Sequence, residues 1–149
     1  MTKKITKSIK EATITKGLIK KSPISHGVGR RKSAVARVWL RHGTGDIIIN
    51  HKNFVAYCST DVAKRAVLEP IALVGAASEF FFDINVKGGG IHSQADAIKL
   101  GISRSLATHS EEYRKLLKEK GYLTVDSRLK ERKKPGQAGA RKKFQFVKR

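Results

Sequence analysis

The sequence predicts an α+β protein, a two-layer sandwich in which helices pack on a small mixed sheet. Two segments, 33–41 and 79–87, alternate apolar and polar residues with the period of a β-strand. Two others, 91–108 and 111–120, repeat their apolar residues every three to four positions, as amphipathic helices do. Because the chain has 149 residues, about the size of one domain, these elements are expected to share one core.

The charge is confined to the two ends of the chain. Of the formal net charge of +20, residues 1–42 carry +11, residues 43–127 carry none and residues 128–149 carry +9. Dense like charges oppose compaction. We therefore expect a basic, flexible extension over 1–26, a globular core over 27–127 and an extended basic tail over 128–149. An excess this large indicates a polyanionic partner, nucleic acid above all.

The first half of the core is predicted to begin with a hairpin. Residues 33–41 alternate as a strand with one wetter face, and Ile47-Ile48-Ile49 is a β-branched run that favours a second strand. Between them, 42–46 contains the glycines that a tight reversal needs. We therefore predict pairing of 33–41 with 46–50. Ser59 or Thr60 then caps a helix that starts at Asp61, and Pro70 ends that helix near 69 or kinks it.

The second half has clearer periodicity. In strand 79–87 the residues Phe80, Phe82, Ile84 and Val86 form a core face, and Phe81 falls on the polar face. Three glycines then lead into the helix over 91–108, in which Gly101 is expected to allow close packing on the sheet. The helix over 111–120 follows, with Ser110 as its cap.

Candidate sites for nucleic acid lie at both strands and in the tail. Arg30, Arg31 and Lys32 precede the first strand in a predicted loop, and Arg37 and Arg41 extend this cationic strip along the strand's wetter face. Gly88-Gly89-Gly90 is either a tight strand-to-helix connection or a backbone contact to RNA, since it lacks the spacing of a nucleotide loop.

The tail combines cations with aromatic rings, as proteins that bind irregular RNA do. Phe144 and Phe146 are interleaved with the basic residues, whose alternative role would be only to solubilise the chain. The tail cations expected to bind RNA are Arg132, Lys133, Lys134, Arg141, Lys142 and Lys143.

No catalytic, metal or cofactor site is predicted. Cys58 is the single cysteine, which excludes an internal disulfide, and no histidine stands in a recognisable catalytic context with it. No apolar run is long enough to span a membrane. The lysine-rich start of the chain has some features of an organelle transit peptide.

Several motifs in order resemble those of the ribosomal protein S-nine family, the universal ninth protein of the small subunit. The resemblance runs from about Gly27 to Arg149. Its main motifs are Gly29-Arg30-Arg31-Lys32-Ser33, Gly43-Thr44-Gly45, Val86-Lys87-Gly88-Gly89-Gly90, Glu131-Arg132-Lys133-Lys134-Pro135-Gly136 and the terminal Lys148-Arg149.

This resemblance implies a structural, non-enzymatic constituent of the small ribosomal subunit. It implies binding to the head, or 3′ major, domain of the ribosomal RNA, contacts with neighbouring head proteins, and contact of Lys148 and Arg149 with peptidyl-site transfer RNA. It also implies a left-handed β-α-β crossover and a place in the cytoplasm, or in an organelle's ribosome. The competing interpretation is a free-standing protein that binds or compacts nucleic acid.

Overall fold

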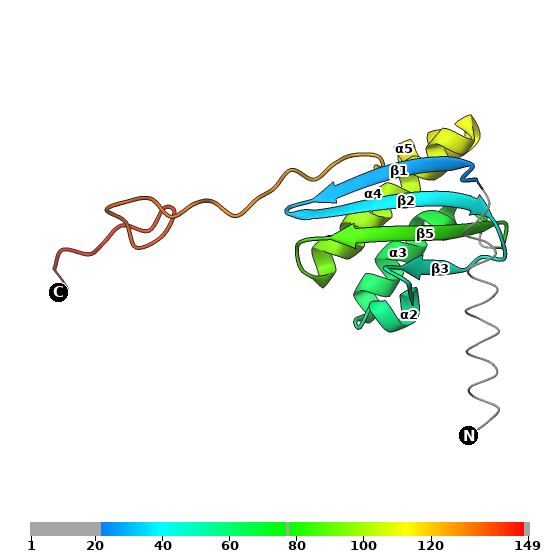
Figure 1. Ribbon diagram of the computed structural model, residues 1–149. Helices are drawn as coiled ribbons and strands as arrows, with labels where there is room; N and C mark the ends of the chain where they lie inside the picture. The colour runs from blue at the N-terminus through cyan, green and yellow to red at the C-terminus, as the bar shows by residue number, and fades with distance from the viewer. Residues whose placement is uncertain (1–21, 77, 148–149) are drawn as a thin grey trace, which may run out of the picture.

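The computed structural model describes residues 22–76 and 78–147, which form one mixed sheet covered by helices (Figure 1). The strands have the spatial order β1-β2-β5-β3-β4, in which only β3 and β5 are parallel. The strands are β1 (Ser25–Arg31), β2 (Ala34–His42), β3 (Ile47–Ile49), β4 (Lys52–Asn53) and β5 (Phe80–Lys87), and the helices are α2 (Phe54–Tyr57), α3 (Asp61–Val74), α4 (Ile91–His109) and α5 (Glu111–Glu119).

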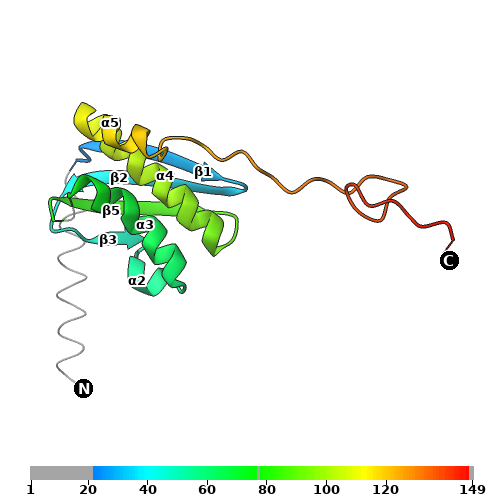
Figure 2. The same cartoon turned by 180° about the vertical axis from the view of Figure 1, so that it is seen from behind.

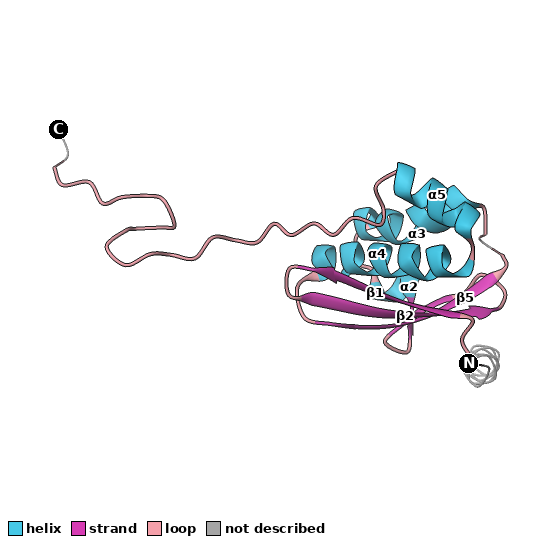
Figure 3. Cartoon of the chain, turned by 90° about the horizontal axis from the view of Figure 1, so that it is seen from above, coloured by secondary structure: helices cyan, strands magenta, loops and turns pink. Residues whose placement is uncertain are grey.

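The helices α3, α4 and α5 lie on the same side of the sheet, which gives the predicted two layers (Figure 3). The core-facing residues of β2 and β5 are buried, as the alternation predicts, and they pack on Ile98, Ile102 and Leu106 of α4. Within the described residues, no helix covers β1, β2 or β5 on the opposite side of the sheet (Figures 1 and 3). We call that side the open face.

The predicted hairpin of 33–41 with 46–50 is wrong. Strand β2 pairs with β1 and β5, and β3 pairs with the far edge of β5. The glycine turn does not close a hairpin because it bonds to β5 instead: the amides of Gly43 and Gly45 donate to the carbonyls of Glu79 and Phe80 at 3.2 and 3.1 Å. Strand β5 offers β2 eight residue pairs with an apolar core face, which a three-residue β3 cannot match.

Strand β1 occupies a segment for which the sequence predicts a loop. It pairs with β2 over Ser25–Arg31, so the regular structure begins two residues before the expected start of the core at residue 27. The Ser25 hydroxyl donates to the carbonyl of Ser105 at 2.8 Å, which ties this strand to α4. Residues 1–21 of the predicted N-terminal extension lie outside the described residues.

The glycines of β1 and α4 explain how closely the two layers approach. A Cβ at Gly29 would lie 1.9 Å from the carbonyl oxygen of Ala97, and one at Gly27 would lie 2.2 Å from that of Gly101. A Cβ at Gly101 would lie 2.7 Å from Cγ2 of Val38, which confirms the predicted close packing of this helix on the sheet. The contact therefore depends on backbones meeting without side chains between them.

Helix α3 does not end near residue 69. It continues through Pro70 to Val74 and stops at Gly75, whose φ of 72° gives a left-handed cap. Proline removes one backbone hydrogen bond, and burial of Pro70 and Ile71 against the core offsets that loss. The other predicted helices match α4 and α5 closely, although Ser110 makes no side-chain cap bond.

The tail leaves the sandwich after Asp126 and runs away from it (Figures 1 and 2). Its cations up to Lys143 and both phenylalanines are exposed, and Phe146 is wholly so. In the described part of the chain, no helix has the length and apolar character needed to cross a membrane.

Candidate nucleic-acid interface

Three cations from three different strands share the open face. Because side chains alternate along a strand, Arg30 of β1, Arg37 of β2 and Lys87 of β5 point to the same side. Val35 lies opposite both Arg30 and Lys87, and Arg37 lies opposite Asn85, so the three form a cluster around a shallow hollow. All three are exposed, and no described carboxylate forms a salt bridge with them. Their charge is available to an external anion.

Arg31 does not join this cluster, although it is adjacent to Arg30 in sequence. It points to the helix side, where its guanidinium lies 2.9 Å from the Asp126 carboxylate and 3.5 Å from that of Asp96. It also donates to the carbonyl oxygen of Arg128 at 3.0 Å, and only 15% of its side chain is exposed. Arg31 therefore holds the first residues of the tail against the core.

Arg41 also departs from the predicted cationic strip. It is buried to 9% exposure, and its guanidinium lies 3.8 Å from the Asp83 carboxylate on the neighbouring strand. Its side chain is only 11% exposed and is paired with Asp83, so its charge is used within the protein. The strip along β2 thus ends at Arg37.

The turn between β1 and β2 lies beside the glycines that follow β5. A Cβ at Gly88 would lie 2.3 Å from the carbonyl oxygen of Ser33, and one at Gly89 would lie 3.0 Å from Cβ of Ala34. Both glycines have positive φ, 75° and 67°. The chain's own packing thus requires glycine at these two positions, which favours the tight strand-to-helix connection as their role.

Gly90 differs from its two neighbours. Its φ is −103°, and a Cβ there would meet nothing within 4 Å, so nothing in the described chain requires glycine at this position. It is the N-cap of α4, and Lys32 projects from the adjoining turn as an exposed cation. The backbone amides at a helix start attract anions, and an open Gly90 leaves them accessible.

Of the six tail cations predicted to bind RNA, five are exposed and form no ion pair with a described residue. They are Arg132, Lys133, Lys134, Lys142 and Lys143. Arg141, the sixth predicted residue, forms a bidentate ion pair with Glu131 instead. Lys148 and Arg149 lie outside the described residues.

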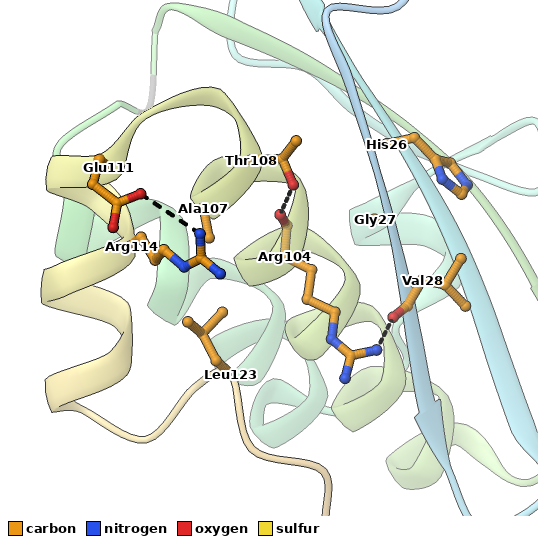
Figure 4. A pocket seen from close by; sticks show the side chains of 9 residues that line it. All are labelled: His26, Gly27, Val28, Arg104, Ala107, Thr108, Glu111, Arg114 and Leu123. Carbon is orange, nitrogen blue, oxygen red and sulfur yellow. Dashed lines mark hydrogen bonds and ion pairs between the residues drawn. The ribbon is translucent and has the colours of Figure 1, made fainter.

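A further hollow lies between the free edge of β1 and helices α4 and α5 (Figure 4). Arg104 projects from α4 and donates to the carbonyl of Val28 at 2.7 Å, which satisfies one acceptor on the unpaired strand edge. Arg114 lies 3.6 Å from Glu111 on the far side of the hollow. Both arginines are thus engaged within the protein, and we do not assign this hollow to a ligand.

Cys58 has the properties of a core residue. It is 2% exposed, and burial raises the pKa of its thiol, so the neutral form dominates at neutral pH. Within the described residues, no group of three or more His, Cys, Asp or Glu side chains is arranged to hold a metal ion.

Comparison with known proteins decides the family. The sequence model of the family described as Ribosomal protein S9/S16 matches residues 29–149. The chain belongs to this family. The resemblance to ribosomal protein S-nine drawn from the motifs is therefore confirmed, and the family is structural rather than enzymatic.

Bacterial S9 proteins are similar to the chain over most of its length. The small ribosomal subunit protein uS9 of Borrelia duttonii (strain Ly) is 50% identical over 136 residues, which cover 91% of this chain and 100% of that protein. The proteins of the same name from Azobacteroides pseudotrichonymphae genomovar. CFP2 and Cytophaga hutchinsonii are each 44% identical over 126 residues, 85% of this chain and 98% of theirs.

Three residues of this S9/S16 protein's open face were missed by the sequence analysis. Lys87 lies on the polar side of β5, where the alternation of strand 79–87 places it, but it was not named as a candidate for binding. His26 and Trp39 are cross-strand neighbours with ring centroids 5.7 Å apart. Since β1 was not predicted, no signal paired these rings. Aromatic faces next to cations are the groups on which nucleic-acid bases stack.

Proposed function

We propose that this S9/S16 protein is a structural constituent of the small ribosomal subunit that binds ribosomal RNA. Three surfaces make the contacts: the open face, the turn at Lys32 with Gly88–Gly90, and the tail. The observation that carries the proposal is that Arg30, Arg37 and Lys87, from three strands, gather on the open face with no described carboxylate to neutralise them. Such a cluster is stabilised by phosphates, which relieve the mutual repulsion of the cations.

Family membership supports the finer parts of the proposal. The RNA is the head, or 3′ major, domain of small-subunit ribosomal RNA, and the neighbours are other head proteins of a cytoplasmic or organelle ribosome. The crossover from β3 to β5 is left-handed. The alternative, a free-standing protein that binds or compacts nucleic acid, would not sediment with small subunits after a moderate salt wash.

The open face is tested by removing its three cations together. We expect the combined variant Arg30→Gln, Arg37→Gln and Lys87→Gln to have a weaker salt dependence. The negative slope of log affinity against log salt for isolated small-subunit RNA should become less steep by roughly 2 to 3. The matched control replaces Lys115, Lys118 and Lys120, on and just after α5, by Gln, which removes the same charge from the helix layer. If both triple variants lost the same affinity, only net charge would matter and the open face would not be the interface.

The end of the tail is proposed to contact peptidyl-site transfer RNA through Lys148 and Arg149. The 22 residues of 128–149 could span roughly 70 Å if fully extended, at about 3.3 Å per residue. The Glu131–Arg141 pair takes about ten residues out of that path, which leaves a reach of roughly 40 Å. This is still enough for the end of the tail to lie well away from the core.

Deleting Lys148 and Arg149 separates the two roles of the tail. We expect subunit assembly to be unchanged, because the cations of 130–143 remain, and transfer-RNA affinity of isolated subunits to fall about five- to thirtyfold, the equivalent of about 1 to 2 kcal/mol. Unchanged transfer-RNA binding at full occupancy of the protein would refute the assignment. A loss of occupancy would assign the two residues to ribosomal RNA.

A further inference from the structure

Part of the tail is folded into a closed loop, although the sequence predicts an extended segment. Glu131 and Arg141, ten residues apart, make a bidentate pair: Nε of Arg141 lies 2.8 Å from Oε2, and Nη2 lies 2.6 Å from Oε1. The amide of Ala138 donates to the carbonyl of Lys142 at 2.9 Å, and Gln137 and Lys143 form a β-bridge. The loop is visible midway along the tail in Figures 1 and 2.

A turn at Pro135-Gly136 allows the chain to reverse inside this loop. Proline presets its own φ, and Gly136 adopts a φ of 71°, which side chains disfavour. The backbone bonds close a second, tighter turn over 137–143, and the Glu131–Arg141 pair joins residue 131 to that turn. The ion pair is therefore the contact that brings the two sides of the loop together.

Glu131 is the only acidic residue in a tail with ten cations. A lone carboxylate should weaken binding to phosphates, since it repels them. However, its hydrogen bonds from Arg141 lower the pKa of the Glu131 carboxyl, so the carboxylate stays ionised and paired. The pair neutralises itself, and the remaining five cations of the loop stay exposed on both sides of it.

We propose that the Glu131–Arg141 pair closes residues 131–143 into a preformed RNA-docking loop, and that Glu131 therefore strengthens RNA binding despite its negative charge. The proposal rests on the RNA-binding function proposed above. Because Glu131 and Arg141 are in contact, closure holds Arg132, Lys133 and Lys134 nearer to Lys142 and Lys143 than an extended chain would. Such a cluster fits the closely spaced phosphates of a folded RNA, and the ordering cost is met before binding.

The decisive variant is Glu131→Gln in the full chain, titrated against isolated small-subunit ribosomal RNA at fixed salt. It raises the net charge by one, so simple electrostatics predicts tighter binding. Preorganisation predicts binding about two- to fivefold weaker, the range expected for losing one exposed bidentate ion pair. Affinity equal to or greater than that of the wild type would overturn the proposal.

Two charge-matched double variants form the control. Glu131→Gln with Arg141→Gln, and the exchange Glu131→Arg with Arg141→Glu, both keep the net charge of +20. We expect the exchange to bind within about twofold of the wild type, because it restores a pair, and the double glutamine variant to bind about two- to fivefold more weakly. Equal affinities for the two would overturn the proposal, since the pair would then contribute nothing.

The loop can also be observed in the free protein. The Arg141 Nε–H donates to Glu131, so its NMR resonance should shift on Glu131→Gln, together with the amide resonance of Ala138. An unchanged Arg141 resonance would mean that the loop is not closed.

If the wild type itself failed to prefer small-subunit RNA over unrelated RNA of equal length, the proposed function would fail. If the wild type bound small-subunit RNA tightly and Glu131→Gln bound it equally well, only the docking-loop proposal would be refuted, and the proposed function would stand.

Discussion

Gly29 is the position at which a single methyl group should damage this fold most. An ideal Cβ there would lie 1.9 Å from the carbonyl oxygen of Ala97 and 2.6 Å from the amide nitrogen of Gly101. Normal contacts between carbon and a carbonyl oxygen are about 3.3 Å or longer. Both obstructing atoms belong to the backbone of α4, so no rotamer change can remove the clash. The helix and β1 would have to separate by about 1 Å or more.

Two effects of Gly29→Ala oppose each other. Alanine in place of glycine within a strand should stabilise the fold by about 0.5 to 1 kcal/mol, because the unfolded chain loses freedom. Overpacking costs about 1 to 3 kcal/mol in typical cores and more where backbone must move. The contact between β1 and α4 leaves no room for a side chain at Gly29, so we expect a net loss of about 2 to 3 kcal/mol. The thermal midpoint should then fall by about 10 to 20 °C.

Urea unfolding of the full chain, followed by fluorescence of the single tryptophan, Trp39, measures this loss directly. Gly90→Ala is the matched control, since a Cβ there meets nothing within 4 Å. Loss of a glycine N-cap should cost that variant less than about 1 kcal/mol. If Gly29→Ala were as stable as Gly90→Ala, the two layers would not be held in contact at the distance described, and the explanation for the glycines of β1 would be wrong.

Three further outcomes are expected. A chain ending at Ser127 should keep its thermal midpoint within a few degrees, because the tail adds little burial; unfolding of that chain would make the tail part of the core. RNA affinity of the full chain should fall roughly 10³- to 10⁵-fold between about 50 and 200 mM salt for about 6 to 10 phosphate contacts, and a flat salt profile would contradict the electrostatic account. Hydrogen bonds from Arg128 hold the pKa of the Asp126 carboxyl well below its usual range, with a smaller contribution from the charge of Arg31. The stabilisation from this lowered pKa is fully present above the unfolded value of about 3.9 and is lost as the pH falls below it. NMR titration should therefore show Asp126 still ionised at pH 3, and Arg128→Gln should raise the pKa of Asp126 towards its usual value.

The sequence predicted elements with strong periodicity and failed where the pattern was hidden. Strand β5 and helices α4 and α5 were predicted closely, because apolar residues repeat there without interruption. Strand β1 was missed because Gly27 and Gly29 occupy its core-facing positions, and glycine has no side chain to reveal the alternation. Of the two outcomes predicted at Pro70, an end near residue 69 was wrong, because burial of Pro70 overrides proline's local preference.

The candidate interface was predicted in composition but not in arrangement. The sequence identified Arg30, Arg31 and Arg37 as one cationic group. A strand alternates its side chains, so the undetected β1 sends Arg30 to the open face and Arg31 to the helix layer. Lys87 joins Arg37 only because β5 pairs with β2, and pairing partners are not encoded by local periodicity.

The sequence alone determined the quantities that depend on composition and local order. It determined the charge segregation, the neutral core between basic ends, the α+β class and, through its motifs, the family. Tertiary structure decided which strand lies between β2 and β3, which arginines are neutralised by Asp83, Asp96 and Asp126, and how the tail closes on itself through Glu131. Each of these depends on contacts between residues far apart in the chain, whose free energies are comparable to those of their alternatives, so only the packing of the whole molecule selects among them.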